Sequence, residues 1–282
     1  MQPEYRRSPS GVAQIPPAIN RERVVCVASG KGGVGTSVAA SLLALSVAGN
    51  GARVLLIDGN EGSGALHHLF GVRPSLSLDA LRDPAVAVDD VLIRWTEGFA
   101  LVASRPAHEE QAGISADARR APFERLLPLT SDFDLIVVDA GARLDNVLAV
   151  IDGGAGNVML VSDADRISLA ANYALLKVLS QKVPPARCSV LVNRHDDAIA
   201  QAATERLSEA CLRFLDFEVA AAGSLPDDAC LRAALGAGMP IGDAAEGSPA
   251  ARAMSAVADR VWPSPVVARA LAGGTHSNDS WS

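Results

Sequence analysis

Six short apolar runs, rich in β-branched residues, alternate along this chain with longer stretches of helical character. Runs of this kind are typical of strands that are buried on both faces of a parallel sheet. They lie at residues 23–29, 53–58, 99–104, 134–139, 157–162 and 188–193. The expected helices lie at about 36–49, 116–130, 166–180, 196–214, 227–236 and 248–261. This alternation predicts a doubly wound α/β fold, with helices flanking a mostly parallel sheet of about seven strands.

The length and composition favour one main domain. The chain has 282 residues, 49% of them hydrophobic, and a mean hydropathy of +0.20, which is enough for a large core. Residues 1–22 hold four prolines and no periodic pattern, so we expect a flexible N-terminal leader there. The domain is expected at 23–262, and residues 263–282 form a tail that we expect to be disordered.

The charge and the cysteines exclude several classes of function. A net charge of −7 provides no general attraction for nucleic acid, so no specific nucleic acid binding is expected. The basic pair Arg119 and Arg120 is read as a solvated helix face. The four cysteines are far apart, without metal-ligand spacing, and we expect buried, reduced thiols. No apolar run is long enough to span a membrane and no signal peptide is recognisable, so a cytoplasmic protein is expected.

A glycine-rich loop follows the first apolar run directly. Residues 29–40 read SGKGGVGTSVAA, with Gly30 and Gly35 five positions apart and Ser37 at the start of the next helix. Glycines with this spacing let backbone NH groups converge on phosphate oxygens, and a following hydroxyl can meet Mg²⁺. Thr36 occupies the position after the last glycine, where such loops normally carry a lysine. The alternative reading is a glycine-rich turn that binds no ligand.

The stretch KGGVG, with Lys31 at its front, resembles the deviant phosphate loop of the MinD/ParA ATPases, whose pattern is KGGVGK[ST]. That resemblance implies ATP or ADP as ligand, with Mg²⁺. It implies that Lys31 crosses a nucleotide-dependent homodimer to reach the partner's phosphates, as a catalytic group in trans. The implied phosphate-binding residues are Gly30, Lys31, Gly32, Gly33, Val34, Gly35, Thr36 and Ser37.

Further positions match the same family. Asp58 ends the second run and Asp139 ends the fourth, where the resemblance implies that they hold Mg²⁺ together with Ser37, directly or through water. An aspartate after a strand can equally be a helix cap, so Asp139 indicates a metal site only in combination with the glycine loop. The family's adenine contacts correspond to Asn193, Pro226 and Asp228.

Two positions depart from the family pattern. Thr36 replaces the lysine, and removing a charged donor from a phosphate site is expected to weaken binding about tenfold to a hundredfold. A deleted lysine, with Thr36 as the magnesium hydroxyl, is the alternative, but it shifts the helix register against Gly51. Asn60 replaces the aspartate that positions the attacking water, and an amide cannot accept that proton. Glu61 could substitute only if its side chain turned toward the same site.

Several stretches are similar to the flagellar-number regulators called FlhG or FleN. They are DGNEGSGALHHLFG (58–71), SLAANYALLK (168–177), RFLDFEVAAAGSLPDD (213–228) and SPAARAM (248–254). The resemblance implies an ATP-dependent regulator of a flagellar GTPase of the FlhF type or of a flagellar transcription activator, located at times on the inner face of the membrane.

Two functional segments of that branch have no good counterpart in this sequence. Its N-terminal activator motif is absent, and its membrane helix corresponds at best to VVARALAG (266–273), so only weak lipid contact is expected. The alternative function is an active MinD/ParA-type ATPase that positions another envelope machine, for pili, secretion or cellulose synthesis, or that acts in partitioning.

Overall fold

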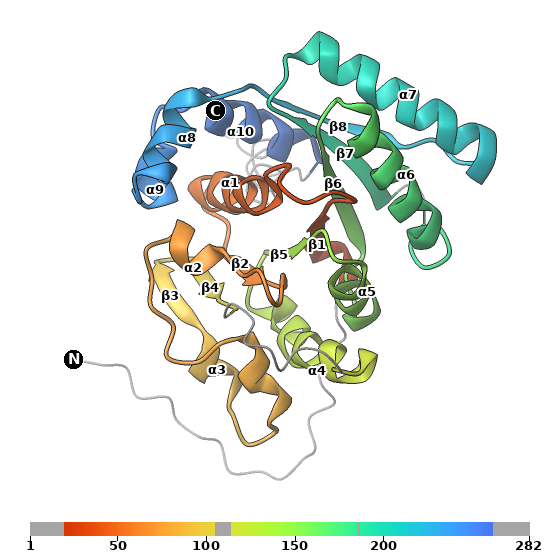
Figure 1. Ribbon diagram of the computed structural model, residues 1–282. Coiled ribbons are helices and arrows are strands. Elements are labelled where there is room, and N and C mark those ends of the chain that lie inside the picture. Colours follow the sequence, from red (N-terminus) through yellow and green to blue (C-terminus); the bar gives the residue numbers. More distant parts are fainter. Residues whose placement is uncertain (1–19, 105–113, 185–186, 262–282) are drawn as a thin grey trace, which may run out of the picture.

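The computed structural model describes residues 20–104, 114–184 and 187–261 (Figure 1). Most of the expected leader, and the whole expected tail with VVARALAG at 266–273, lie outside the described residues. Residues 20–22, at the end of the expected leader, take part in the fold: Arg21–Arg23 forms a 3₁₀ turn, η1, and the Asn20 amide donates to Thr130 Oγ1.

The apolar runs form strands because their Val, Ile and Leu side chains are buried on both faces of the sheet. The strands are β1 (Val24–Ala28), β2 (Val54–Asp58), β3 (Ile93–Thr96), β4 (Phe99–Val102), β5 (Leu135–Gly141), β6 (Asn157–Ser162), β7 (Cys188–Asn193) and β8 (Ala220–Leu225). They form one sheet in the order β3-β4-β2-β5-β1-β6-β7-β8. All neighbours are parallel except β3 and β4. The expected α/β class with a mostly parallel sheet is confirmed, and the sheet has eight strands where about seven were predicted.

The helices agree closely with the sequence prediction, and the additional ones are mostly short. They are α1 (Thr36–Gly49), α2 (Leu66–Leu69), α3 (Val88–Val91), α4 (Ala116–Leu126), α5 (Leu144–Gly153), α6 (Arg166–Leu179), α7 (Asp197–Leu215), α8 (Ala229–Gly236), α9 (Ile241–Ala244) and α10 (Pro249–Val261). Two further 3₁₀ segments are η2 (Leu78–Arg82) and η4 (Leu127–Ser131). Within the described ranges, no helix has the length and hydropathy needed to cross a bilayer.

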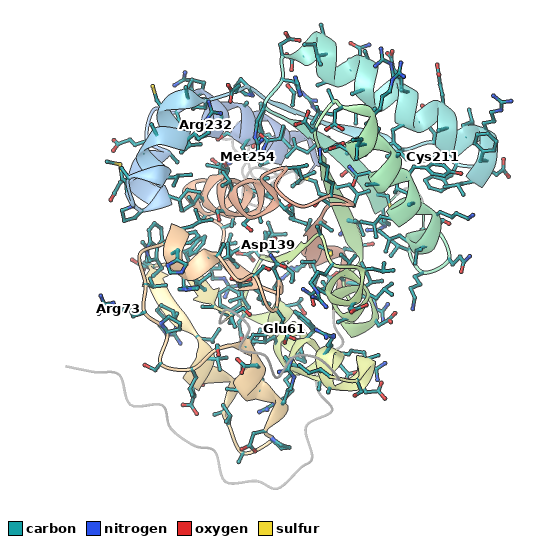
Figure 2. The ribbon with its side chains drawn as sticks, viewed as in Figure 1. Glu61, Arg73, Asp139, Cys211, Arg232 and Met254 are labelled. Atoms are coloured by element: carbon teal, nitrogen blue, oxygen red, sulfur yellow. The ribbon has the colours of Figure 1, made fainter. Side chains whose placement is uncertain are left out.

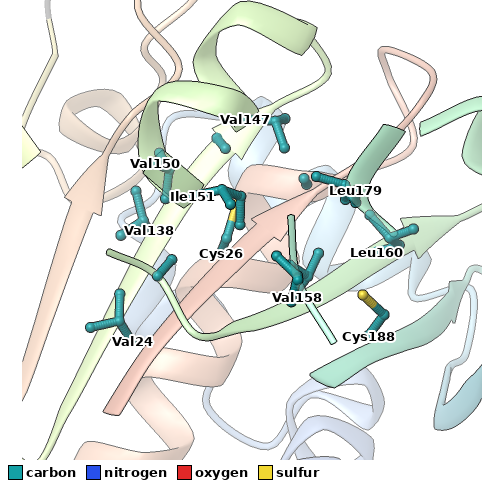
Figure 3. Close-up of a cluster of buried hydrophobic side chains, with 14 of the residues drawn as sticks. Val24, Cys26, Val138, Val147, Val150, Ile151, Val158, Leu160, Leu179 and Cys188 are labelled. Atoms are coloured by element: carbon teal, nitrogen blue, oxygen red, sulfur yellow. The ribbon is translucent and has the colours of Figure 1, made fainter. Parts of the chain in front are cut away.

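Two apolar cores lie on the two faces of the sheet. One contains side chains of α4, α5, α6 and α7, and the other contains side chains of α1, α2, α8, α9 and α10. Figure 3 shows part of the first core, where Val147, Val150 and Ile151 of α5 pack over Cys26 of β1. The arrangement is the helix-covered parallel sheet that the strand–helix alternation predicts.

The prediction of four buried thiols is correct for three. Cys26, Cys188 and Cys211 are buried, and burial raises the pKa of Cys188 and of Cys211 to about 11, so these thiols are poor nucleophiles. Cys230 is exposed, since it lies on the solvent face of the short helix α8, and it corrects the prediction at that position.

The sheet order positions the candidate site. β5 lies between β2 and β1, and β6 lies on the other side of β1, so the carboxyl ends of these four strands are adjacent. Asp58 of β2 and Asp139 of β5 are register partners, and Val27 of β1 is the partner of Asp139 on the other side. The glycine loop (residues 29–36) therefore begins next to two strand-terminal carboxylates. In open α/β sheets, this edge is where ligands bind.

Candidate nucleotide site

The glycine loop is fixed by close contacts that only glycine permits. A Cβ on Gly30 would lie 2.2 Å from the carbonyl carbon of Ala171 and 2.6 Å from the Asn172 nitrogen on α6. Instead, the Gly30 amide donates to Asn172 Oδ1 at 2.7 Å. Gly33 and Gly35 have φ values of 81° and 91°, a region that other residues rarely adopt. Contacts within the chain thus hold the loop in this shape.

The loop ends where α1 begins, with Gly35 as the N-cap and no described side chain bonded to the cap. Backbone NH groups in the first turn of a helix have no partner within the helix, and they carry the positive end of the helix dipole. A loop of glycines followed by an uncapped helix start is the usual geometry for binding phosphate.

Thr36 cannot act as a cation, and its hydroxyl is already engaged. The residue is buried, with 8% of its surface exposed, and Oγ1 donates to Ser29 Oγ at 3.1 Å. Ser29 Oγ in turn donates to the Lys31 carbonyl at 2.8 Å. Thr36 therefore braces the base of the loop and adds no charge toward a ligand.

Asp58 and Asp139 form a buried pair of carboxylates behind the loop. Neither is exposed to solvent. Asp58 accepts from the amides of Asn60 (3.2 Å) and Leu66 (3.1 Å), while Asp139 Oδ1 accepts from the Gly141 amide (3.1 Å). Asp139 Oδ2 is buried without a hydrogen-bond partner. Figure 2 places Asp139 near the middle of the molecule.

The electrostatics of this pair fit a cation. Burial raises the pKa of Asp139 to about 6, against smaller opposing effects of the Ser37 hydroxyl and the Gly141 amide. Burial, and next the charge of Asp139, raise the pKa of Asp58. An unpartnered carboxylate oxygen beside a second carboxylate and a hydroxyl is a donor set that Mg²⁺ prefers. The residues predicted for the metal, Ser37, Asp58 and Asp139, thus lie together and fit it.

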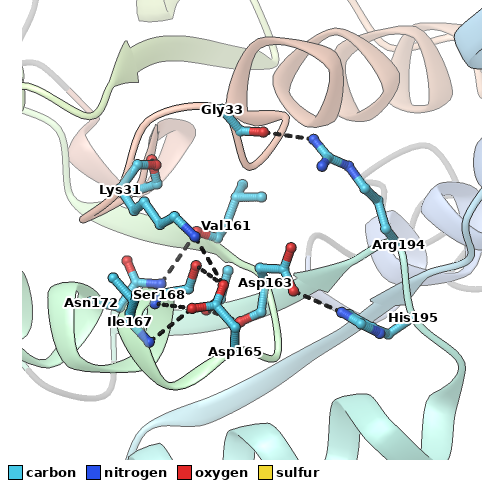
Figure 4. A network of polar contacts seen from close by, with 12 residues as sticks. Lys31, Gly33, Val161, Asp163, Asp165, Ile167, Ser168, Asn172, Arg194 and His195 are labelled. Carbon is cyan, nitrogen blue, oxygen red and sulfur yellow. Dashed lines mark hydrogen bonds and ion pairs between the residues drawn. The ribbon is translucent and has the colours of Figure 1, made fainter.

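Lys31 is held within its own chain. Its Nζ lies 3.0 Å from Asp165 Oδ2, and both side chains are about two-fifths exposed. Asp165 is the N-cap of α6 and accepts from the amides of Ile167 and Ser168 at 2.8 and 3.0 Å (Figure 4). The hydrogen bond from Lys31 is the main cause of the lowered pKa of Asp165.

The three predicted base-binding residues lie beside the loop. Asn193 and Pro226, with Asp228, line a cavity of about 140 Å³ that Gly35 and Val38 also border. Asn193 Nδ2 donates to the Val34 carbonyl at 2.8 Å. Asp228 is the N-cap of α8 and also accepts from Ser248 Oγ at 2.6 Å. Larger hollows of about 720 and 1060 Å³ lie elsewhere, but none of the predicted site residues lines them.

Glu61 does not take the place of the aspartate that Asn60 replaces, because its side chain is engaged in other contacts. It is 2% exposed and forms ion pairs with Arg82 of η2 and with Arg119 of α4, the latter at 3.5 Å. The Glu61 carbonyl also accepts from Asn146 Nδ2 at 3.3 Å. Asn60 itself donates to the Ser63 carbonyl.

Arg119 corrects a prediction, because it is 7% exposed and paired with Glu61 instead of lying on a solvated face. Arg120, its neighbour, forms ion pairs with Asp117 and Glu124 along the helix surface. The two neighbours thus differ in burial: Arg119 is buried against Glu61, and Arg120 is paired at the helix surface.

Other residues at the site were not predicted. Asp165 is the N-cap of α6, Asn172 lies within α6, and Arg194 follows β7. The pattern SDAD after β6 could have indicated Asp165, because an aspartate before a helix is a usual N-cap. Asn172 and Arg194 carry no such signal, since the fold alone brings them to the loop.

Comparison with known proteins agrees with the fold and the site. Residues 25–241 match the family described as CobQ/CobB/MinD/ParA nucleotide binding domain, and the chain therefore belongs to that family. This confirms the MinD/ParA resemblance of the glycine loop.

Individual relatives give the finer likeness. The chain is 28% identical over 246 residues to the antiactivator FleN of Pseudomonas aeruginosa, which covers 86% of this chain and 88% of FleN. It is 28% identical over 160 residues to the flagellum site-determining protein YlxH of Helicobacter pylori, 56% of this chain and 54% of that protein. The septum site-determining protein MinD of Pyrococcus horikoshii, complexed with Mg-ADP, has the same fold, with a TM-score of 0.69, 19% identity, and 85% and 96% of the two chains covered.

Proposed function

We propose that this protein is a MinD-like regulator of flagellar number or placement that binds ATP or ADP and hydrolyses ATP slowly or not at all. The similarity to FleN over most of both chains supports the flagellar context. One observation carries the slow hydrolysis: Thr36 is neutral and already bonded to Ser29, while the carboxylates Asp58 and Asp139 stay in place.

The nucleotide would be held by the glycine loop and the adjoining cavity. Loop amides and the start of α1 suit the phosphates, and the cavity lined by Asn193 and Pro226 suits an apolar, planar base. Ser37, Asp58 and Asp139 would hold Mg²⁺, which when bound would neutralise charge on the β- and γ-phosphates.

Turnover requires groups that this chain has changed. Phosphoryl transfer depends on positive charge around the phosphates and on a positioned water. Thr36 supplies no charge, Asn60 cannot act as a general base, and Glu61 is paired with two arginines. The site therefore favours a nucleotide that stays bound over one that is hydrolysed.

A nucleotide-dependent homodimer is the proposed active form. Lys31 would exchange Asp165 for the phosphates bound by the partner. Gly32 and Gly33 are exposed beside it, and Ile167, two residues after Asp165, is 70% exposed although it is apolar. A second copy that covers this face would bury Ile167. The regulated partner would be a flagellar GTPase of the FlhF type or a flagellar transcription activator, with weak or transient membrane contact.

The second candidate is an active ATPase that positions another envelope machine, and Lys31 is the observation that favours it. Its side chain is two-fifths exposed, so it can reach a partner's nucleotide and supply in trans the charge that Thr36 lacks. Hydrolysis by the wild type that collapses in Lys31→Ala would support this candidate.

Phosphate release under saturating Mg-ATP tests the proposal. The wild type is compared with the double variant Thr36→Lys/Asn60→Asp, which restores the family's groups. We expect release at least about tenfold faster in the double variant, the factor that corresponds to ~1.4 kcal/mol of barrier. Equal rates in the two proteins would contradict the proposal that these two positions limit turnover.

A further inference from the structure

Strand β8 (Ala220–Leu225) forms one edge of the sheet, away from the glycine loop. It pairs with β7 on one side, while α7 covers one face of this end of the sheet and α10 covers the other (Figure 1). A hollow of about 720 Å³, the β8 groove, lies between α7 and this edge. Its lining includes Ala220, Ala221 and Gly223 of the strand, and Arg260 near the end of α10.

The backbone of β8 is accessible from the groove because its side chains are small. The strand reads AAAGSL, and Ala220 and Ala221 are exposed. It contains no charged residue and no proline, which commonly block the edge of a sheet against another strand. Ala222 has no register partner in β7, and its carbonyl accepts a long bond of 3.5 Å from Arg260 Nη1. The edge therefore presents backbone donors and acceptors that a further strand can meet.

A polar face of α7 (Asp197–Leu215) forms one wall of the groove. The lining positions on this helix recur every three or four residues, so they lie along one side of it. They include Asp197, Gln201, Thr204 and Ser208. The wall thus offers hydrogen-bonding side chains beside the strand edge.

The groove carries an excess of negative charge. Its lining includes three acidic side chains, Asp197, Glu205 and Glu218. One cation, Arg260, stands against them in the part of the chain that the structure describes. Asp197 accepts from Ser224 Oγ, but no ion pair within the described ranges involves any of the three acids. Their charge is thus open to a cationic ligand.

We propose that the β8 groove binds an extended segment of another protein, which carries basic side chains and pairs with β8 as an additional strand. A peptide added to a sheet edge gains affinity from backbone hydrogen bonds, and specificity from side chains that meet the walls. Basic side chains of this segment would meet Asp197, Glu205 and Glu218. The volume of the groove lies within the range of clefts that hold ligands in proteins.

A second copy of this chain fits the groove less well. If the β8 strands of two copies paired, the symmetric contact would bring the two α7 helices onto the same face of the joined sheet. Their acidic side chains, Glu205 among them, would then approach one another and repel. An extended peptide brings no such helix, so the charge of the groove favours a basic peptide.

Fluorescence anisotropy with a labelled peptide tests the inference on the full chain. The probe is a blocked peptide of alternating lysine and valine, long enough to span β8. A matched peptide has the same side chains and N-methylated backbone amides, so it keeps the charge and loses its hydrogen-bond donors. We expect it to bind at least about tenfold more weakly, because two or more hydrogen bonds are lost. A peptide with glutamate in place of lysine should not bind.

Charge reversals locate the binding. Glu205→Lys/Glu218→Lys should weaken binding of the lysine–valine peptide by about tenfold, since attraction at two exposed positions becomes repulsion. Asp89→Lys/Glu97→Lys is the matched control. It changes the net charge equally at two exposed positions near β3, at the opposite edge of the sheet. Its affinity for the peptide should stay within about twofold of the wild type.

Amide hydrogen exchange gives a readout that charge alone does not move. Bound peptide should slow exchange in β8, because its backbone gains partners. Four results would overturn the inference: no binding of the lysine–valine peptide, equal affinity of the N-methylated peptide, equal losses in the two charge-reversed variants, or unchanged exchange in β8. Binding that appears only after removal of residues 262–282 would also overturn it, because that segment of the chain would then be the occupant of the groove.

Discussion

Lys31 at the front of the glycine loop and Asp165 at the start of α6 form an ion pair of 3.0 Å within one chain. The same lysine is the group that the family resemblance assigns to the partner's phosphates. In the proposed dimer, Lys31 would have to leave Asp165 before it could cross the interface, so we expect the ion pair to oppose dimerisation.

Replacing Asp165 by asparagine should favour the dimer. Asparagine is a good N-cap, so the bonds to the Ile167 and Ser168 amides can be kept while the charge is lost. We expect the ATP-dependent dimer to form at a concentration a few-fold lower than in the wild type, since an exposed ion pair is weak. Sedimentation velocity with and without ATP measures this, and a dimer that weakens in Asp165→Asn would show that the ion pair does not oppose dimerisation.

The pKa of Asp139 makes stability depend on pH. Its pKa is about 6 in the folded protein against a usual 3.8, so folding favours the protonated carboxyl. The stability contributed by that proton is present below about pH 4 and is lost as the pH rises through about 6. Asp139→Asn should therefore be more stable than the wild type at pH 7.5, on the order of 2 to 3 kcal/mol, with the difference vanishing near pH 4.

Urea unfolding of both proteins from pH 4 to 8, in EDTA, checks this prediction. A difference that stays constant with pH would show that the carboxyl pair is not the cause. Addition of Mg-ATP at pH 7.5 should stabilise the wild type more than Asp139→Asn, because the metal would relieve the buried charge.

The approach of Gly30 to α6 predicts a sharp contrast between two glycines. Gly30→Ala places a Cβ 2.2 to 2.6 Å from the backbone of Ala171 and Asn172, so the loop or α6 must move. We expect the free energy of unfolding to fall by about 2 to 4 kcal/mol. Gly32→Ala is the control, because nothing lies within 4 Å of its added Cβ, and its change should stay below about 1 kcal/mol. Similar values for both variants in urea unfolding would show that the loop is not held against α6.

The buried contacts of Glu61 predict a structural role. Glu61→Gln leaves Arg82 and Arg119 without their carboxylate, and breaking a buried ion pair in this way should cost about 2 to 4 kcal/mol. Glu124→Gln is the matched control, since that glutamate is half exposed in its pair with Arg120 and should cost less than about 1 kcal/mol. If Glu61→Gln were as mild as the control in thermal unfolding, Glu61 would be free to act elsewhere.

The sequence predicts the centre of this fold well because the signals there are local. Each buried strand is a continuous apolar run, and Asp58 and Asp139 stand at the ends of such runs, so parallel pairing alone brings them together. The helix that follows the glycine loop, Thr36–Gly49, has the predicted bounds because a glycine N-cap and a glycine at 51 with φ of 83° mark its ends.

Other elements escape prediction for physical reasons. β3 has four residues of mixed polarity at the sheet edge and is defined mainly by its two-residue turn to β4, which ends in Gly98 with φ of 80°. Helix α5 was not among the predicted helices, because its sequence is an apolar stretch that lies between two strands. Contacts such as Glu61 with Arg82 or Arg194 with Gly33 join residues 21 and 161 positions apart, and only the folded chain reveals them.

Calorimetric titration of the purified wild type with Mg-ATP, beside Thr36→Lys, shows whether the glycine loop binds nucleotide and what Thr36 does to the affinity. We expect saturable binding at one site per chain in the wild type, and binding about tenfold to a hundredfold tighter in Thr36→Lys. Absence of binding to the wild type at millimolar ATP would contradict the claim that the glycine loop of this protein still holds a nucleotide.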